Sequence, residues 1–313
     1  MNQFSVTVLG SSSALPTSKR FTSAHVMNIH ERFFLIDCGE GTQVQLRRFK
    51  VRFGKIDHVF ISHVHGDHIL GIFGLLSSFN LLGRTKALHI YGPADIKIII
   101  DDHFKYYEHD RKFKIVYHFI EPNEKQVIYE DKSVFIEAIS LKHRVDTFGF
   151  LFHEKRRPNH MKKEKIEEYS IPVLKIPEII QGADFITEEG ELIKNEELTY
   201  PSYTPRTYAY ISDTMFDESI VPHIKDFHLL YHESTFLEEH HELAKETYHS
   251  TARQAAEVAE KANVRKLLLG HFSTRYKRIE RFEEEAAAVF PNIVLAEDGL
   301  RIDVPCDDEK SDF

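Results

Sequence analysis

The feature that most constrains this sequence is a set of metal-binding side-chain types packed into six consecutive positions: His63, His65, Asp67 and His68. It directly follows residues 57–61 (DHVFI), an apolar run that predicts a buried strand. In extended backbone, alternate residues point to the same side, so the first two histidines can reach one ion. Gly66 permits a tight reversal that turns the last two ligands toward a second position. One catalytic zinc ion uses about three protein ligands. The cluster and its downstream partners therefore indicate two ions.

Three later residues occupy comparable places, each just past an apolar strand: His143, Asp213 and His271. The preceding runs are VFIEAISLK, YAYIS and RKLLLG. Loops at strand ends collect over one edge of an α/β-type sheet, so these residues are candidate ligands. The chain has 20 His, and any single one more often has a surface or core role. The spacing of the HxHxDH cluster favours metal binding, whereas the pattern around the other three leaves a structural role equally open.

The order of expected elements points to an α/β fold. The length of 313 residues allows one large domain or two modest ones. In the first half we expect helices over 42–49 and 70–82 and strands over residues 4–9, 25–29, 33–36, 57–61, 88–91, 115–119 and 134–139. Strands and helices alternate again after residue 206, with helices over 250–262 and 277–289. Two β-rich halves flanked by helices predict an αββα sandwich formed by a single domain, residues 1–313.

Residues 153–205 differ from the rest of the chain. They are rich in Lys, Glu, Pro and Ile and sustain no period, so we interpret them as an inserted arm. The formal net charge of −9 argues against a nucleic-acid partner, since nonspecific affinity for phosphate comes mostly from Lys and Arg. Residues 154–165, however, hold six basic and two acidic residues, a local charge of +4.

Cysteine use and hydropathy bear on the compartment. Two cysteines, Cys38 and Cys306, cannot build a disulfide framework, which suits a reducing compartment. The first residues lack a basic region followed by a long apolar region, so we expect no signal peptide. No uninterrupted apolar run approaches the roughly 18 residues of a membrane span. We expect a cytoplasmic protein.

Several motifs resemble those of the metallo-β-lactamase superfamily and, more narrowly, of the ribonuclease Z family, which processes tRNA 3′ ends. They appear in family order over both halves of the chain: LIDCGEGTQ (35–43), SHVHGDH (62–68), SDT (212–214), HESTF (232–236), HSTARQAA (249–256) and LLLGHFSTRY (267–276). The HxHxDH motif identifies only the superfamily. The HEST, HST and GHFSxRY motifs are specific to the nuclease branch.

The resemblance implies a metallo-β-lactamase sandwich with a flexible arm, and a zinc-dependent endoribonuclease that removes 3′ trailers from precursor tRNA by hydrolysis and leaves a 3′-hydroxyl. It implies two Zn²⁺ per subunit. One ion would be held by His63, His65 and His143, the other by Asp67, His68 and His271, with Asp213 bridging. Two such ions can activate water and stabilise a leaving oxygen.

The resemblance also implies further roles near the ions. Asp67 would accept a proton from the attacking water, and His249, positioned by Glu233, would protonate the leaving 3′-oxygen. A helix start is compatible with this role, because Ser250 or Thr251 is a good N-cap. Asp37 would hold a zinc-bound His in its tautomer, although a turn or capping role is nearly as good an interpretation.

In that family the arm, here 153–205, clamps the tRNA elbow. The expected substrate-binding residues are Lys155, Arg156, Arg157, Lys162, Lys163 and Arg275. The family match departs at two places. The stretch 171–177 (IPVLKIP) lacks a Gly-Pro pair at the arm tip, and 16–21 (PTSKRF) retains only part of a loop that rejects tRNAs ending in CCA. The resemblance further implies a homodimer in which one subunit's arm serves the other's active site.

Other functions remain open on the sequence alone. A small-molecule phosphodiesterase or thioester hydrolase would use the same two-zinc fold, but the HEST and HST motifs and the long arm disfavour it. A di-iron redox protein of this fold would need a flavin module, for which the chain has no spare length. A non-enzymatic metal-binding or RNA-binding scaffold would predict that His65→Ala or Asp67→Ala leaves RNA cleavage unchanged.

Overall fold

The computed structural model describes residues 3–107 and 111–306. These residues form two compact units. The first contains most of residues 3–153 and 206–305, and the second consists mainly of Glu154–Pro205.

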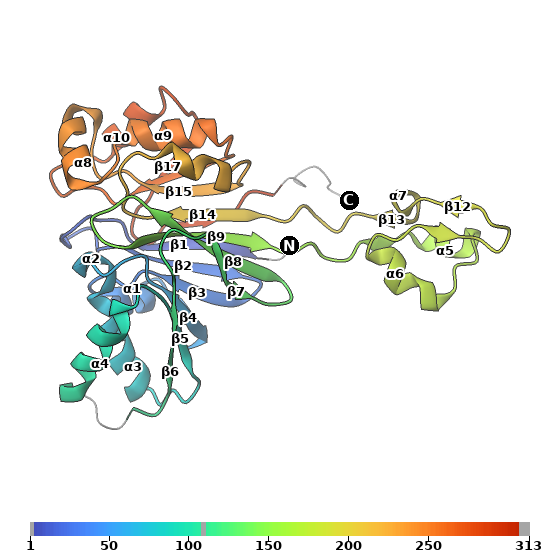
Figure 1. Ribbon diagram of the computed structural model, residues 1–313, viewed down its shortest axis with the longest axis horizontal. Helices are drawn as coiled ribbons and strands as arrows, with labels where there is room; N and C mark the ends of the chain where they lie inside the picture. Colours follow the sequence, from blue (N-terminus) through green and yellow to red (C-terminus); the bar gives the residue numbers. More distant parts are fainter. Residues whose placement is uncertain (1–2, 108–110, 307–313) are drawn as a thin grey trace. The chain divides into compact units, whose positions relative to one another are not determined.

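The first unit contains two seven-stranded sheets that lie face to face (Figure 1). The first sheet has the order β18 (Arg301–Asp303), β1 (Phe4–Gly10), β2 (Ala24–Ile29), β3 (Arg32–Ile36), β4 (Ile56–Phe60), β5 (Leu88–Gly92) and β6 (Ile115–Phe119). The second has the order β17 (Ile293–Leu295), β16 (Leu267–Gly270), β15 (Leu229–Glu233), β14 (Thr207–Ile211), β9 (Thr147–Glu154), β8 (Val134–Leu141) and β7 (Gln126–Glu130).

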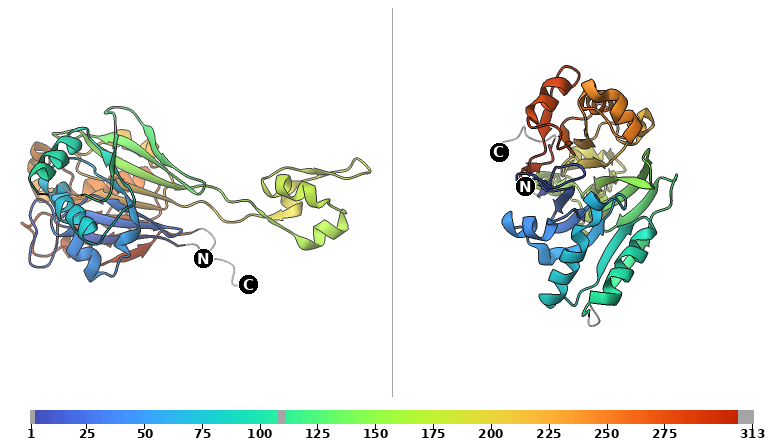
Figure 2. Two further views of the ribbon diagram at one scale, coloured as in Figure 1. Left: turned by 90° about the horizontal axis from the view of Figure 1, so that it is seen from below. Right: turned by 90° about the vertical axis from the view of Figure 1, so that its left-hand side faces the viewer.

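Helices cover the outer face of each sheet, which confirms the predicted αββα sandwich (Figure 2). Against the first sheet pack α1 (Thr42–Arg48), α3 (Gly71–Leu81) and α4 (Asp95–Tyr107); α2 (Gly66–Ile69) and the 3₁₀ turn η1 (Phe53–Lys55) lie in its loops. Against the second pack α9 (Ala252–Lys261) and α10 (Glu280–Ala286), together with α8 (His241–Thr247), η3 (Glu218–His223) and η4 (Glu238–His240). None of the helices within 3–107 and 111–306 is both long and apolar enough to cross a membrane.

The two faces of each sheet bury different residue types, because successive strand residues point to opposite faces. In β14, Ala209 and Ile211 face the aliphatic core under α9. Tyr208 and Tyr210 face the other way and join the aromatic layer between the sheets, in which Phe60 packs edge to face on Phe150 at a ring-centroid distance of 5.5 Å. This rigid interior holds the strand ends of both sheets in register.

Strand direction places the loops that carry the predicted ligands. Neighbouring strands run parallel from β3 to β6 and from β14 to β17. Parallel strands bring their carboxyl ends to one edge of a sheet. The segments after β3, β4, β14, β15 and β16 therefore emerge at such edges of the two sheets.

The second unit has its own small core. Its elements are β10 (His160–Met161), α5 (Lys163–Glu168), the 3₁₀ turn η2 (Val173–Lys175), α6 (Ile176–Ile180), β11 (Phe185–Ile186), β12 (Leu192–Ile193), α7 (Asn195–Leu198) and β13 (Thr199–Tyr200). Ile171, Ile179, Phe185, Ile193 and Leu198 are buried together. The helices have four to six residues each, too few for an amphipathic period to appear in the sequence.

Candidate metal centre and active site

The structure brings the seven predicted metal ligands together. The HxHxDH loop follows β4, and Asp213 and His271 follow β14 and β16 of the other sheet. His143 lies two residues beyond β8. Among the described residues, three groups of side chains have all their potential ligand atoms within 4.8 Å of one another: a first group of His63, His65, His143 and Asp213, a second of Asp67, His68 and His271, and a third in which His249 joins Asp213 and His271.

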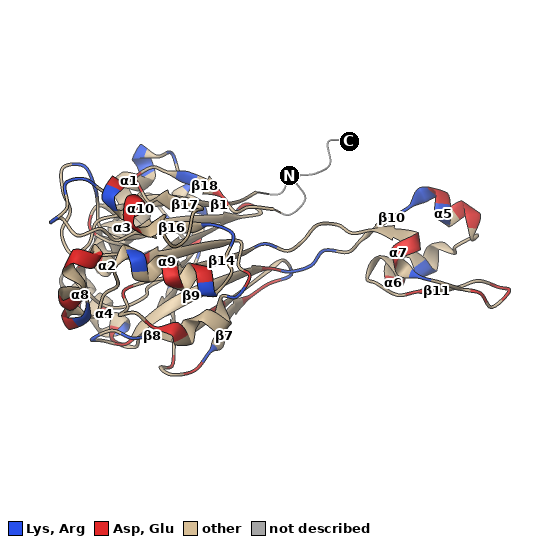
Figure 3. Ribbon diagram, turned by 90° about the horizontal axis from the view of Figure 1, so that it is seen from above, with Lys and Arg blue, Asp and Glu red and all other residues tan. Residues whose placement is uncertain are grey.

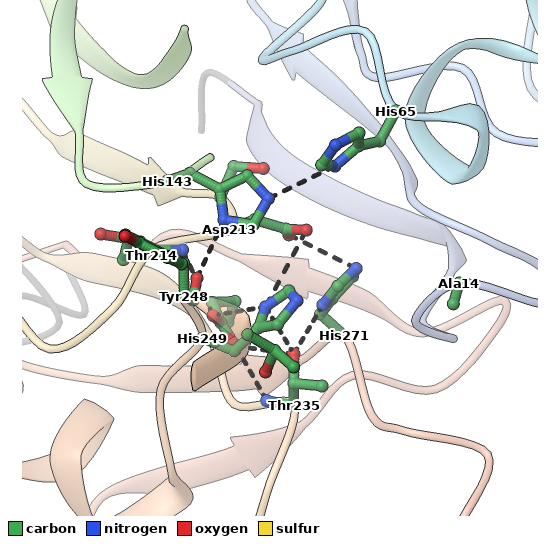
Figure 4. A network of polar contacts seen from close by, with 12 residues as sticks. Ala14, His65, His143, Asp213, Thr214, Thr235, Tyr248, His249 and His271 are labelled. Carbon is green, nitrogen blue, oxygen red and sulfur yellow. Dashed lines mark hydrogen bonds and ion pairs between the residues drawn. The ribbon is translucent and has the colours of Figure 1, made fainter. Parts of the chain in front are cut away.

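The first group is a cluster of converging imidazole nitrogens (Figure 4). Nδ1 of His65 lies 3.1 Å from Nε2 of His63 and 3.3 Å from Nε2 of His143. The remaining nitrogens of two rings have partners: Nδ1 of His143 is 2.9 Å from the carbonyl oxygen of Tyr248, and Nδ1 of His63 is 3.0 Å from Oγ of Ser62. A ring that donates from Nδ1 leaves the lone pair of Nε2 for an ion.

Burial keeps these rings in the form that binds metals. It holds the pKa of His63 well below its usual value, an effect that the neighbouring His68 adds to. The pKa of His143 is lowered chiefly by burial as well. Neutral imidazoles with inward lone pairs are the ligands that a divalent transition ion needs.

The second group joins two imidazoles and a carboxylate. Nε2 of His271 lies 3.3 Å from Nε2 of His68 and 3.3 Å from Oδ2 of Asp67. On the outer side, Nδ1 of His271 is 2.8 Å from Oγ1 of Thr235. The backbone N–H of Ala14 donates to Oδ2 of Asp67 over 2.7 Å and so fixes that carboxylate.

Asp213 faces both groups with different oxygens. Its Oδ1 lies 3.4 Å from Nε2 of His68 and 3.3 Å from Nε2 of His271, and its Oδ2 lies 3.6 Å from Nε2 of His63. The residue is 3% exposed, yet no described residue forms a hydrogen bond of good geometry with Oδ1. A buried carboxylate oxygen without a hydrogen bond is costly. The position of Asp213 between the two groups fits a carboxylate that bridges two cations. The mixed imidazole and carboxylate donors suit zinc.

Without a metal, carboxylates and histidines in this site share protons. Burial by itself would lower the pKa of His68, but the carboxylates of Asp213, Asp37 and Asp67 raise it well above the usual value. Correspondingly, burial would raise the pKa of Asp213, whereas His271 and His68 hold it well below its usual value. The carboxylates of this buried site carry negative charge, which bound divalent cations would neutralise.

Asp37 holds the HxHxDH loop through contacts with Ser62 and His68. It is fully buried, and its Oδ2 lies 2.7 Å from Nδ1 of His68. The N–H and hydroxyl of Ser62 donate to the two carboxylate oxygens, and the phenol of Tyr210 donates to Oδ2 over 2.8 Å. This arrangement agrees with the tautomer-holding role expected of Asp37. The sequence carried no signal for Tyr210, because it lies on β14 in the other sheet.

His249 and Glu233 form the second part of the site. Nδ1 of His249 donates to Oε1 of Glu233 over 3.0 Å. Although burial lowers the pKa of His249, Glu233, Asp213 and Asp67 raise it to about 9. Glu233 is itself completely buried and also accepts from the N–H of Ser250. Thr251 is the N-cap of α9, in a capping box with Gln254, so the helix start and the position of His249 coexist.

Thr235 connects the two parts. It stands in the HESTF motif, but no role was predicted for it from the sequence. Its hydroxyl donates to Oε2 of Glu233 over 2.8 Å, which leaves its oxygen to accept from Nδ1 of His271. The same oxygen lies 3.2 Å from Nδ1 of His249. Thr235 thereby orients one ligand and the proton-carrying histidine at once.

Four non-glycine residues around the site have left-handed backbone: Ala14, Asp37, Tyr248 and His271, with φ between 48° and 67° like the other such residues of the chain. Each such residue costs roughly 1–3 kcal/mol, and strain of this kind gathers at functional sites. Each of the four makes a contact to the ligand set described above.

The expected substrate-binding residues divide between the units. Arg275 is exposed in the loop after His271, in the first unit. Lys155, Arg156, Arg157, Lys162 and Lys163 belong to the second unit. Of these, Arg156 and Lys163 are exposed and form no ion pair with any described residue, while Nζ of Lys162 donates to the carbonyl of Glu196.

The arm as a whole is not basic. Residues 154–205 contain eight Lys or Arg and eleven Asp or Glu, a net charge of −3. Figure 3 shows basic and acidic residues interleaved along α5. Six of the eight basic residues lie within the segment 155–165.

Comparison with known proteins gives consistent matches. A family model described as the anti-Pycsar protein Apyc1 matches residues 4–157. The ribonuclease Z of Bacteroides fragilis is 45% identical over 302 residues, which are 96% of this chain and 99% of that protein. Among solved structures, the short form of human tRNase Z has a TM-score of 0.69 and 25% identity, and the alignment covers 96% of this chain and 99% of that one. A metallo-β-lactamase fold protein from Bacillus subtilis, 20% identical with a TM-score of 0.69 over 97% of this chain and all of that one, shares the fold.

Proposed function

The chain belongs to the ribonuclease Z family, and on that basis we propose that it is an endoribonuclease that removes 3′ trailers from precursor tRNA by hydrolysis. The observation that carries this function is the buried pair of His249 and Glu233 beside the ligand groups, with Nδ1 of His249 4.0 Å from Oδ2 of Asp213. The nuclease-specific motifs thus supply a proton donor next to a metal site. The product would be a tRNA with a 3′-hydroxyl.

We propose two zinc ions per subunit. His63, His65 and His143 would hold one, Asp67, His68 and His271 the other, and Asp213 would be shared by both. When bound, such a pair of ions activates water and offsets the charge of a phosphodiester.

Asp67 and His249 would each carry out one of the two proton transfers. Asp67, fixed through Oδ2 by the Ala14 N–H, would accept a proton from the attacking water on its other oxygen. As the water oxygen bonds to phosphorus, the bond from phosphorus to the 3′-oxygen breaks. His249, protonated at neutral pH by virtue of its raised pKa, would give its Nε2 proton to that oxygen. Glu233 would stabilise the protonated ring through Nδ1.

The arm would bind a part of the precursor other than the cleavage point. Residues 155–165 offer cationic side chains, and Arg157 and Lys162 lie over the rings of Tyr203 and Tyr200 at 5.5 and 5.0 Å. Cations next to aromatic rings are common in RNA-binding surfaces. We further propose a cytoplasmic homodimer in which the arm of one subunit serves the active site of the other.

The proposed function is tested by substrate preference. The zinc-loaded protein is given a trailer-bearing precursor tRNA, a small phosphodiester and a thioester, and kcat/KM is measured for each. We expect the precursor to be by far the best substrate. Preference for the thioester or the small phosphodiester would instead support a small-molecule hydrolase on the same fold.

A further inference from the structure

Tyr248 has a backbone conformation that does not require its side chain. It ends α8 with φ 60° and ψ 47°, the left-handed region that glycine adopts most easily. Hydrogen bonds fix the backbone on both sides: the N–H of His249 donates to the carbonyl of Ala244 over 2.8 Å, and the carbonyl of Tyr248 accepts from Nδ1 of His143 over 2.9 Å. Glycine would satisfy all of these contacts. The backbone at this position therefore does not explain why the residue is a tyrosine.

Tyr248 borders the site through its backbone carbonyl, and its side chain is open to solvent. Tyr248 is 40% exposed, and it stands between His143 and His249 (Figure 4). The guanidinium carbon of Arg144 lies 5.9 Å from the centroid of its ring. Nη2 of Arg144 donates to the carbonyl of Glu246 over 2.8 Å, which anchors the guanidinium at the end of α8. The phenol oxygen of Tyr248 forms no hydrogen bond with any described residue.

A partly exposed aromatic ring beside an anchored guanidinium is a surface on which a nucleobase stacks. Arg144 directly follows one predicted ligand and Tyr248 directly precedes the predicted proton donor. A base that contacts them would therefore belong to a nucleotide close to the bond that is cut. Resting on the proposed function, we propose that Tyr248 and Arg144 form a stacking platform for a nucleobase flanking the scissile phosphate, and that Tyr248 is a specificity-determining residue.

The platform can be tested by removing the Tyr248 ring, the flanking nucleobase, or both. Precursor tRNAs are made with an abasic nucleotide on either side of the cleavage point, and kcat/KM is measured for the wild-type protein and for Tyr248→Gly and Tyr248→Phe. Tyr248→Gly suits the left-handed backbone, so it removes the ring without strain. Bound zinc is measured for each variant. Arg144→Gln provides a second, milder perturbation.

We expect one of the two abasic positions to lower kcat/KM of the wild-type protein about tenfold, the effect of losing one stacked base. Tyr248→Gly should lower it about as much on the unmodified precursor, and the abasic position should then cost nothing more. Tyr248→Phe should behave like the wild-type protein, Arg144→Gln should lose about threefold, and zinc content should not change.

An abasic penalty that is equally large in wild type and in Tyr248→Gly would overturn the platform, as would an absent penalty at both positions. So would a loss of zinc from Tyr248→Gly with the abasic penalty intact, since Tyr248 would then act only through His143. Failure of the wild-type protein to cut the unmodified precursor is a separate result, and it would overturn the proposed function itself.

Discussion

Asp213 is the residue on which the candidate centre depends most. Its two oxygens face different groups of ligands, at 3.3 and 3.4 Å on one side and 3.6 Å on the other. The neighbouring imidazoles offset part of the cost of burying this carboxylate, and cations on both sides would offset more of it.

Asp213→Asn should therefore reduce bound zinc from about two ions per chain to at most one, since a neutral amide offers one oxygen and no charge. Metal content after dialysis, measured by atomic emission, checks this. Asp217→Asn is the matched control: Asp217 is also buried, but it caps η3 and pairs with Lys142 at 2.9 Å. Equal zinc content in both variants would show that Asp213 is not a bridge.

His249→Ala should lower kcat by roughly 10²–10⁴, the range for losing a general acid, with zinc content unchanged. Glu233→Gln should lower kcat less, because the amide still accepts from Nδ1 of His249 but no longer stabilises its charge. Single-turnover cleavage of a precursor tRNA gives both rates. His241→Ala, at the half-buried first residue of α8, serves as the control. Wild-type kcat in His249→Ala would remove that residue from the mechanism.

Residues of the site differ in how far sequence could predict them. Four ligands stand within one loop, where their spacing alone indicates metal binding. His143, Asp213 and His271 were candidates from their places after strands, and the family resemblance assigned roles to them and to His249 and Glu233. Tyr210 and Ala14 could not be found, because a tyrosine on a strand and an alanine in a loop carry no signal until the two sheets bring them to Asp37 and Asp67.

At the scale of elements, close backbone contact positions the metal-binding loop. The N–H of Gly71, at the start of α3, donates to the carbonyl of Cys38 over 2.8 Å, and the N–H of Cys38 donates to the carbonyl of His68 over 2.8 Å. A Cβ atom on Gly71 would lie only 1.9 Å from the carbonyl oxygen of Gly39. The loops after β3 and β4 are thus in contact through glycines.

Gly71→Ala should consequently lower the free energy of unfolding by about 1–3 kcal/mol, or more if the backbone cannot shift. Urea denaturation followed by circular dichroism measures it. Gly54→Ala is the matched control, because a Cβ there would meet no atom within 4 Å. If both variants unfold at the same urea concentration, the close contact has no energetic consequence.

The elements themselves were largely predictable where a period could develop. The expected helix over 70–82 corresponds to α3, and that over 250–262 to α9. Helix α4 was not predicted, although its buried residues Ile96, Ile100 and Phe104 recur every four positions. The elements of residues 154–205 have too few residues to show any period.

At the scale of the whole molecule, the net charge of −9 did not exclude an RNA substrate. The acidic arm shows that average charge is a poor guide even within one segment, since six of its eight basic residues lie within 155–165. Binding of RNA by such an arm would rest on a few local contacts rather than on its overall field.

Replacing the arm tests its role without disturbing the first unit. His153 of β9 and Thr207 of β14 are register partners in an antiparallel ladder, so Asn-Gly in place of residues 155–205 can close a two-residue hairpin. We expect kcat/KM for precursor tRNA to fall by at least about tenfold, while hydrolysis of a small phosphodiester and zinc content persist. Combined loss of both activities would mean that the arm is structural. Unchanged tRNA processing would mean that it does not bind the substrate.

The central claim is that this metal site cuts precursor tRNA at the 3′ end of the mature sequence. It is tested most directly by mapping both product ends after incubation of the zinc-loaded protein with a trailer-bearing precursor, with Asp213→Asn in parallel. We predict a single cut beside the discriminator base, a 3′-hydroxyl on the tRNA, a 5′-phosphate on the trailer and no cut by the variant. Cleavage elsewhere, a 3′-phosphate product, or equal cleavage by Asp213→Asn would contradict the account.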